Sequence, residues 1–161
     1  MSEASAKPMA GSAPSFASIL AALDDSARAH IVFATAVTLA RCTNARVSLI
    51  RVLTEPTDIP PAAHTNPDHL AIDVERNVQS EFRRLMETAA DVHFDLPLIV
   101  DGDPWRRILQ VAKELDVDLI VMGSHRYHGV ERVLGTVASR VVNHADRNVL
   151  VVHERDSVAA R

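Results

Sequence analysis

Short apolar runs alternate with longer segments of helical period along this chain, and that order limits the fold more than any other feature. The runs suit buried strands and are Ser18 to Leu23, Val47 to Leu53, Phe94 to Val100, Leu119 to Met122 and Val149 to Val152. Strands separated by helices pair in parallel, through right-handed crossovers that place helices on both sides of the sheet. We therefore predict an α/β fold with a single domain and a parallel five-stranded sheet.

The segments between these runs have the periodicity of helices that cover a sheet. Ser26 to Cys42 is apolar on several faces, and Asp68 to Ala90 has apolar residues three or four positions apart, which predicts one buried stripe. The second of these helices should expose the charged residues Glu81, Arg83 and Arg84. A third helix should begin at Pro104 with Asp103 as its N-cap, and a fourth should run from about Thr136 to His144.

Composition excludes several classes of partner. Seventeen basic residues against 21 acidic ones leave a formal charge of -4, without the basic surface that a nucleic-acid backbone requires. The longest apolar run, Ile31 to Ala40, is too short to span a bilayer, so no membrane is expected as a partner. Cys42 is the one cysteine and cannot form an internal disulfide, and its apolar neighbours predict a position in the core.

The two ends of the chain are predicted to be tails. Residues 1–15 are mainly Ala, Ser and Pro without periodicity, and they lack the basic and apolar regions of a signal peptide. We therefore expect a disordered N-terminal tail over 1–15, a domain over 16–155, a short C-terminal tail over 156–161, and a cytoplasmic location.

The loop after the fourth run has the chemistry of an anion site. In sheets of this kind, ligands bind beyond the carboxyl ends of the strands, where the strand order reverses. Gly123 and Gly135 allow close backbone approach and positive φ, and the helix that starts at Thr136 offers free amides. Arg126 adds a cation that can pair with phosphate. A plain turn, with glycines for backbone geometry and Thr136 as a cap, explains the same residues equally well.

At these residues the chain resembles the universal stress protein family, over about residues 18 to 153. The segments that carry the resemblance are Ile19 to Asp24, Gly102 to Pro104, Asp118 to His125, Leu134 to Ala138, Val141 to Ala145 and Val149 to Val152. The resemblance implies strand order 3-2-1-4-5, in an adenine nucleotide alpha hydrolase-like, Rossmann-like fold.

The nucleotide-binding members of that family have a Gly, two residues, a second Gly, nine residues, and then Gly-Ser or Gly-Thr. Gly123 and Gly135-Thr136 match the two ends of this pattern, but Arg126 stands in place of the second Gly and eight residues separate it from Gly135. The resemblance implies that Asp24 lies near adenine and ribose and Val52 beside adenine. It places Gly123, Gly135 and Thr136 on the phosphate side. The other predicted nucleotide-binding residues are Ser124, His125, Arg126, Gly129 and Val137.

Two kinds of function remain open. One is a small regulatory or protective protein that binds ATP or AMP with Mg²⁺, and the other is a nucleotide-free dimeric interaction protein of the stress response. ATP hydrolysis, slow at most, has no evident general base. The histidines His125, His128, His144 and His153 do not converge in the sequence, so we expect no metal site of the chain's own. Val149 to Val152 forms an unprotected edge, which predicts a homodimer through the last strand.

Overall fold

A five-stranded parallel sheet forms the centre of the molecule. The computed structural model describes residues 16–54, 67–124 and 135–153. The elements in chain order are β1 (Ser18–Ala22), α1 (Ala29–Thr43), β2 (Arg46–Leu53), α2 (Pro67–Glu87), β3 (Leu98–Asp101), α3 (Pro104–Glu114), β4 (Leu119–Gly123), α4 (Thr136–His144) and β5 (Asn148–Val152). The strand order is β3-β2-β1-β4-β5, with every pair parallel, which confirms the predicted fold and order. The two predicted tails, 1–15 and 156–161, lie outside the described residues, which begin at Phe16.

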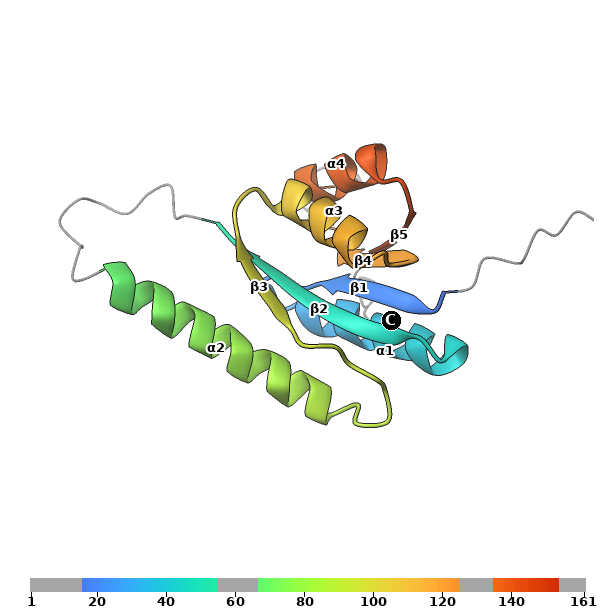
Figure 1. Cartoon of the computed structure of the whole chain (residues 1–161), viewed down its shortest axis with the longest axis horizontal. Coiled ribbons are helices and arrows are strands. Elements are labelled where there is room, and N and C mark those ends of the chain that lie inside the picture. The colour runs from blue at the N-terminus through green and yellow to red at the C-terminus, as the bar shows by residue number, and fades with distance from the viewer. Residues whose placement is uncertain (1–15, 55–66, 125–134, 154–161) are drawn as a thin grey trace, which may run out of the picture.

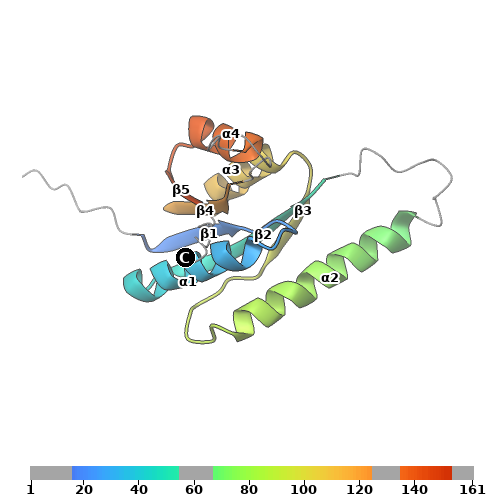
Figure 2. The ribbon, with the colours of Figure 1, turned by 180° about the vertical axis from the view of Figure 1, so that it is seen from behind.

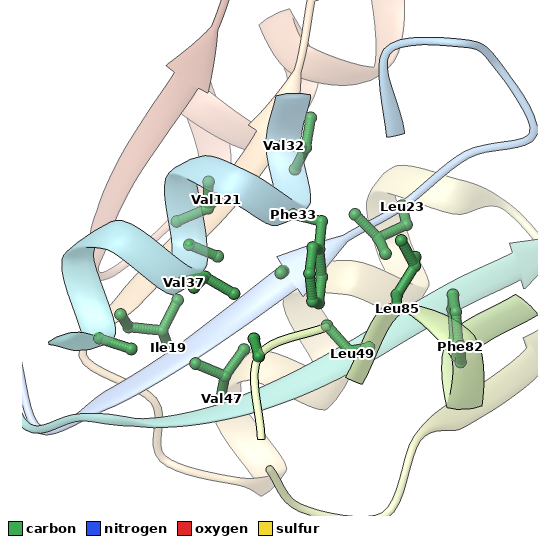
Figure 3. Packing of buried hydrophobic residues seen from close by; sticks show 14 of the residues in the cluster. Ile19, Leu23, Val32, Phe33, Val37, Val47, Leu49, Phe82, Leu85 and Val121 are labelled. Carbon is green, nitrogen blue, oxygen red and sulfur yellow. The ribbon is translucent and has the colours of Figure 1, made fainter. Parts of the chain in front are cut away.

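The helices cover both faces of the sheet, α1 and α2 on one and α3 and α4 on the other (Figures 1 and 2). Alternate residues of β1 explain the two layers, because successive side chains of a strand point to opposite faces. Ile19 and Ala21 pack in the core under α1 and α2, and Figure 3 shows Ile19 there, whereas Leu20 packs with α3 and α4. Of the helices in the described part of the chain, none is long and apolar enough to cross a membrane.

A carboxylate fixes the amino ends of the two central strands. Asp118, just before β4, accepts hydrogen bonds through Oδ2 from the backbone N–H groups of Ala17 and Ser18, at 2.9 Å each, and from Ser18 Oγ at 3.0 Å. Its own N–H donates to the carbonyl of Ser18 at 3.0 Å. These bonds hold the beginnings of β1 and β4 together at the edge opposite the expected ligand site.

Two predicted boundaries were wrong for local reasons. Helix α1 begins at Ala29 rather than Ser26, because Ser26 takes part in a side-chain turn with Asp24. Strand β3 starts at Leu98 rather than Phe94 because Pro97 has no N–H to donate to a neighbouring strand, and Phe94 forms a single isolated bridge.

The predicted cap of α3 is only half correct. Asp103 occupies the N-cap position and Pro104 the first turn, as predicted. The Asp103 carboxylate makes no capping hydrogen bond, however, and lies 3.6 Å from the guanidinium of Arg106. The backbone position is therefore correct and the side-chain role is not.

The prediction that Cys42 lies in the core was also wrong. The residue is exposed near the end of α1. The buried stripe of α1 includes Ala36, Val37 and Ala40, and Cys42 falls outside that stripe because the helix turns by 3.6 residues.

Strand β2 contains a buried arginine. The side chain of Arg51 is 7% exposed, and it donates to the carbonyl of Leu23 at 2.7 Å and to Glu81 Oε1 at 3.0 Å. Its guanidinium also lies 5.5 Å from the ring centre of Phe82. Glu81 therefore faces β2 rather than only solvent, which corrects its predicted place on the exposed face, while Arg83 is exposed as predicted.

Candidate functional site

The carboxyl ends of β1 and β4 lie side by side, and the chain leaves them in opposite directions across the sheet. From β1 it crosses to β2 on one side, whereas β4 leads to β5 on the other. Leu23, just after β1, donates its N–H to the carbonyl of Ile50 at 2.9 Å, and Ser124, just after β4, donates its N–H to the carbonyl of Val152 at 3.0 Å. The strand order reverses at this point, which is where ligands usually bind in sheets of this kind.

Asp24 lies two residues after the end of β1 and is exposed. Its Oδ1 accepts hydrogen bonds from the N–H of Ser26 at 3.1 Å and from Ser26 Oγ at 2.6 Å. Ser26 Oγ in turn accepts from the N–H of Arg28 at 3.2 Å. Asp24 therefore shapes the turn that leads into α1, and it does so without serving as the helix cap, because Arg28 occupies the N-cap position.

Arg28 connects the start of α1 with the end of β4, a contact that the sequence analysis missed. Its Nη1 donates to the carbonyl of Ser124 at 3.2 Å, across 96 positions of the sequence. The only signal in the sequence was a cation four residues after Asp24, at the start of a helix. The bond places a guanidinium beside the end of β4, where it can form a charge-assisted hydrogen bond to an anion.

Ser124, one of the predicted nucleotide-binding residues, is buried and 2% exposed. Its Oγ lies 2.8 Å from Nδ1 of His153, within hydrogen-bond distance, at the end of β5. The hydroxyl of Ser124 is therefore engaged with His153, and the carbonyl with Arg28. Ser124 holds β4, β5 and α1 together at this edge.

The glycines Gly123 and Gly135 do not have the positive φ that we expected of them. Of the described glycines, only Gly102 has one. Gly135 has φ −55° and ψ 156°, and a Cβ at Gly123 would meet Val32 Cγ2 at 3.4 Å, an ordinary contact. Neither conformation demands glycine, so a close approach to the backbone is the remaining physical reason for these residues.

Helix α4 begins at Thr136, as predicted, and it begins without a side-chain cap from the described residues. Its N-cap is Gly135, which is buried and has no side chain to offer. The first helical bond runs from the N–H of Ser139 to the carbonyl of Gly135 at 2.9 Å. The N–H groups of Thr136, Val137 and Ala138 therefore have no partner inside the helix and form its positive end. Such an end binds anions.

The other predicted site residues divide into two groups. Val52 is half-buried near the end of β2 and packs against the core under α3 and α4. His125, Arg126 and Gly129 lie outside the described residues. Within the described ranges, no group of three or more His, Cys, Asp or Glu residues is placed to hold a metal ion.

Comparison with known proteins agrees with this arrangement. The chain is 29% identical over 139 residues to universal stress protein A homolog 1 of Coxiella burnetii, which covers 83% of this chain and 94% of that protein. The solved structure of the universal stress protein UspA from Lactobacillus plantarum superposes with a TM-score of 0.72 at 27% identity, covering 85% of this chain and 97% of the other. The structure of protein MJ0577 from Methanocaldococcus jannaschii gives a TM-score of 0.73 at 25% identity, covering 89% and 99%. The sequence profile described as the universal stress protein family matches residues 15–153. With that match over most of its length and this parallel sheet, the chain belongs to the universal stress protein family.

Proposed function

We propose that this protein binds an adenine nucleotide between the carboxyl ends of β1 and β4 and acts as a small regulatory or protective protein. Residues 16–155 would form the domain that carries this activity. The observation that supports the proposal best is the start of α4, where the N–H groups of Thr136 to Ala138 lack an intrahelical partner and Gly135 supplies no cap. Three amides at the positive end of a helix suit a phosphate group.

Other features of the same edge support a nucleotide rather than a bare anion. Arg28 lies against the end of β4 and adds a cation, while Asp24 offers a carboxylate that can accept hydrogen bonds from hydroxyl groups of a ribose. A solved universal stress protein in complex with cAMP has the same fold at a TM-score of 0.65 and 20% identity. We place the phosphates toward Gly135 and Thr136 and the sugar toward Asp24.

We assign no catalytic cycle to this site. Mg²⁺ would accompany ATP as a counter-ion of its phosphates, since the described residues contain no metal cluster. Regulation by nucleotide requires only that the nucleotide-bound and nucleotide-free forms of the protein differ in their affinity for a partner.

The test is thermal unfolding with ATP, ADP or AMP, each with and without Mg²⁺. A ligand at about a hundred times its dissociation constant stabilises a fold by about 2.7 kcal/mol, which raises Tm by about 5 to 10 °C in a domain of this size. Millimolar nucleotide without any shift would contradict the proposal.

Three variants at two positions identify the site. Gly135→Val should abolish binding, because its side chain obstructs the approach of a phosphate to the backbone. The backbone angles, φ −55° and ψ 156°, are open to valine, and Tm without nucleotide checks that the buried position accepts the side chain. Asp24→Asn keeps the oxygen that Ser26 uses and removes the charge, whereas Asp24→Ala removes both. Both should weaken nucleotide binding, and the matched control Asp25→Ala should not. An unfolded Asp24→Ala protein beside a fully binding Asp24→Asn protein would indicate that Asp24 serves the turn alone.

A second candidate function, a nucleotide-free dimeric interaction protein, is favoured by β5. This strand pairs with β4 on one side and forms the edge of the described sheet, with Leu150 37% exposed. A second copy could cover the edge around a twofold axis. Failure of every nucleotide to bind, together with a stable dimer, would favour this function.

A further inference from the structure

Arg51 connects α2 to the turn that carries Asp24. Its side chain is 7% exposed, and its Nε donates to the carbonyl of Leu23 at 2.7 Å. On the other side of the guanidinium, Nη2 donates to Glu81 Oε1 at 3.0 Å, and the ring centre of Phe82 lies 5.5 Å away. Leu23 and Phe82 both belong to the core under α1 and α2 (Figure 3). The planar guanidinium is therefore held in one position by three groups.

Leu23 is the residue at which the chain of β1 departs from β2. Its N–H donates to the carbonyl of Ile50 at 2.9 Å, as in a parallel ladder. In a regular ladder the carbonyl of the same residue accepts from a backbone N–H of the neighbouring strand. Here the Arg51 side chain donates to that carbonyl. Arg51 therefore keeps the chain attached to β2 up to the first residue of the turn.

The peptide unit that Arg51 holds is the one that joins Leu23 to Asp24. A peptide unit is planar, and the described residues contain no cis peptide bond, so the Cα atoms of these two residues lie about 3.8 Å apart. The direction of the Leu23 carbonyl thus sets the position of Asp24. On the far side of the turn, Arg28 donates to the carbonyl of Ser124 at 3.2 Å. Two arginines therefore anchor the turn, one toward β2 and one toward β4.

The local bonds of Asp24 orient its carboxylate only within the turn. Oδ1 accepts from the N–H of Ser26 at 3.1 Å and from Ser26 Oγ at 2.6 Å. Both partners belong to the turn itself, so these bonds would persist if the whole turn shifted against the sheet. The position of the carboxylate relative to the strand ends depends instead on the two arginine anchors. A carboxylate has about four acceptor sites, so it can accept from a ligand in addition to Ser26.

From this arrangement we propose that Arg51 is a positioning residue that makes the nucleotide site selective for a ribose. It holds the turn where the Asp24 carboxylate accepts hydrogen bonds from ribose hydroxyl groups, without touching the nucleotide itself. This inference rests on the proposed function and adds to it the residue that determines the choice of sugar. A sugar that lacks those hydroxyls cannot donate to Asp24 and should bind more weakly.

The test compares ATP with dideoxy-ATP, which has the same adenine and triphosphate but lacks both ribose hydroxyls. Isothermal titration calorimetry with Mg²⁺ gives the two dissociation constants for each variant, at a temperature well below its Tm. Hydrogen bonds to a charged group set the expected preference, so the unchanged protein should bind ATP about tenfold more tightly than dideoxy-ATP.

Two variants without the ion pair differ only at position 51. Glu81→Gln keeps an oxygen for Nη2 and leaves the bond to Leu23 in place, so the tenfold preference should remain although the fold is less stable. The double variant Arg51→Met with Glu81→Gln fills the same space with an apolar side chain against Phe82 but offers Leu23 no donor. Its preference should fall to less than about twofold, through weaker binding of ATP alone.

Arg51→Lys provides a second variant that retains the charge beside Glu81. Its single ammonium nitrogen replaces a fork that serves two acceptors, so with the ammonium at Glu81 the Leu23 carbonyl loses its donor. The preference for ATP should fall as in the double variant. In the Asp24→Ala background, Arg51→Met should not weaken ATP binding further, because Arg51 acts through Asp24.

A purely structural role of Arg51 would reduce the affinity for both nucleotides by the same factor, and that result would overturn the inference. A tenfold preference retained by Arg51→Lys and by the double variant would overturn it as well. If the unchanged protein binds ATP and dideoxy-ATP equally, the inference fails while the nucleotide site stands. If the unchanged protein binds neither nucleotide, the proposed function fails too.

Discussion

The Glu81→Gln substitution removes the negative charge that faces the buried guanidinium of Arg51 and leaves a carbonyl oxygen in its place. The side chain of Arg51 is 7% exposed and that of Glu81 is 39% exposed, with 3.0 Å between Nη2 and Oε1. After the change, the cation keeps its bond to the carbonyl of Leu23 and its position near Phe82, but no opposite charge. We therefore expect a loss of stability well above that of a surface pair.

The exposed fractions of the Arg51 and Glu81 side chains determine how much stability the substitution should remove. Breaking a fully buried ion pair costs about 3 to 5 kcal/mol, whereas exposed pairs contribute less than about 1 kcal/mol. Because Arg51 is buried and Glu81 is partly solvated, we expect about 2 kcal/mol, which corresponds to a decrease in Tm of about 4 to 8 °C in a domain of this size.

The assay is urea and thermal unfolding at neutral pH, with Asp73→Asn as the matched control. Asp73 and Arg76 form a pair on the same helix at 3.4 Å, with side chains 65% and 71% exposed, so its loss should cost less than about 0.5 kcal/mol. If Glu81→Gln costs no more than Asp73→Asn, or if high salt removes the difference between them, then the pair behaves as a surface pair and the reasoning from burial is refuted.

Three further predictions concern the rest of the surface. Val151→Lys places a charge in the edge strand β5, at a residue that is half-buried against the core under α3 and α4. With folding checked by circular dichroism, light scattering should show one chain in place of the proposed dimer; an unchanged mass would contradict dimerisation through this strand. The Arg41 hydrogen bond lowers the pKa of Asp91, so their pairing stabilises the fold above the unfolded pKa of that carboxyl and is lost as pH falls through the folded one. The Tm difference between Asp91→Asn and the unchanged protein should accordingly be present at neutral pH and vanish in strong acid, and a difference that persists there would have another cause. Cys42 is exposed, so a thiol reagent should modify it in the folded protein about as readily as in urea, and strong protection would place it in the core after all.

The elements could be predicted from the sequence because each depends on its own residues. Alternating β-branched runs and amphipathic segments indicated five strands and the helices between them, and the Gly135-Thr136 pair placed the start of α4 correctly. Contacts between distant residues could not be predicted in this way. An arginine at position 51 gives no sign that its partner is Glu81, and nothing near Arg28 indicates a bond to Ser124.

The same limit explains the errors at single positions. Cys42 looked buried because its neighbours are apolar, yet the angle of α1 against the sheet decides which of them turn inward. For Asp24, the resemblance implied a place near adenine and ribose, and the structure shows that the residue also shapes the turn before α1.

The three bonds that Asp118 accepts have a consequence for how the protein opens. They fasten the beginnings of β1 and β4 to each other, so the amide hydrogens of the buried residues that follow in these two strands should exchange with deuterium only when the whole domain unfolds. At the other end of β4, the N–H of Ser124 depends on the last residue of β5, an edge strand, and should exchange through local fraying at much lower free energy. The ligand-facing edge should therefore open locally while the opposite edge still holds the domain together.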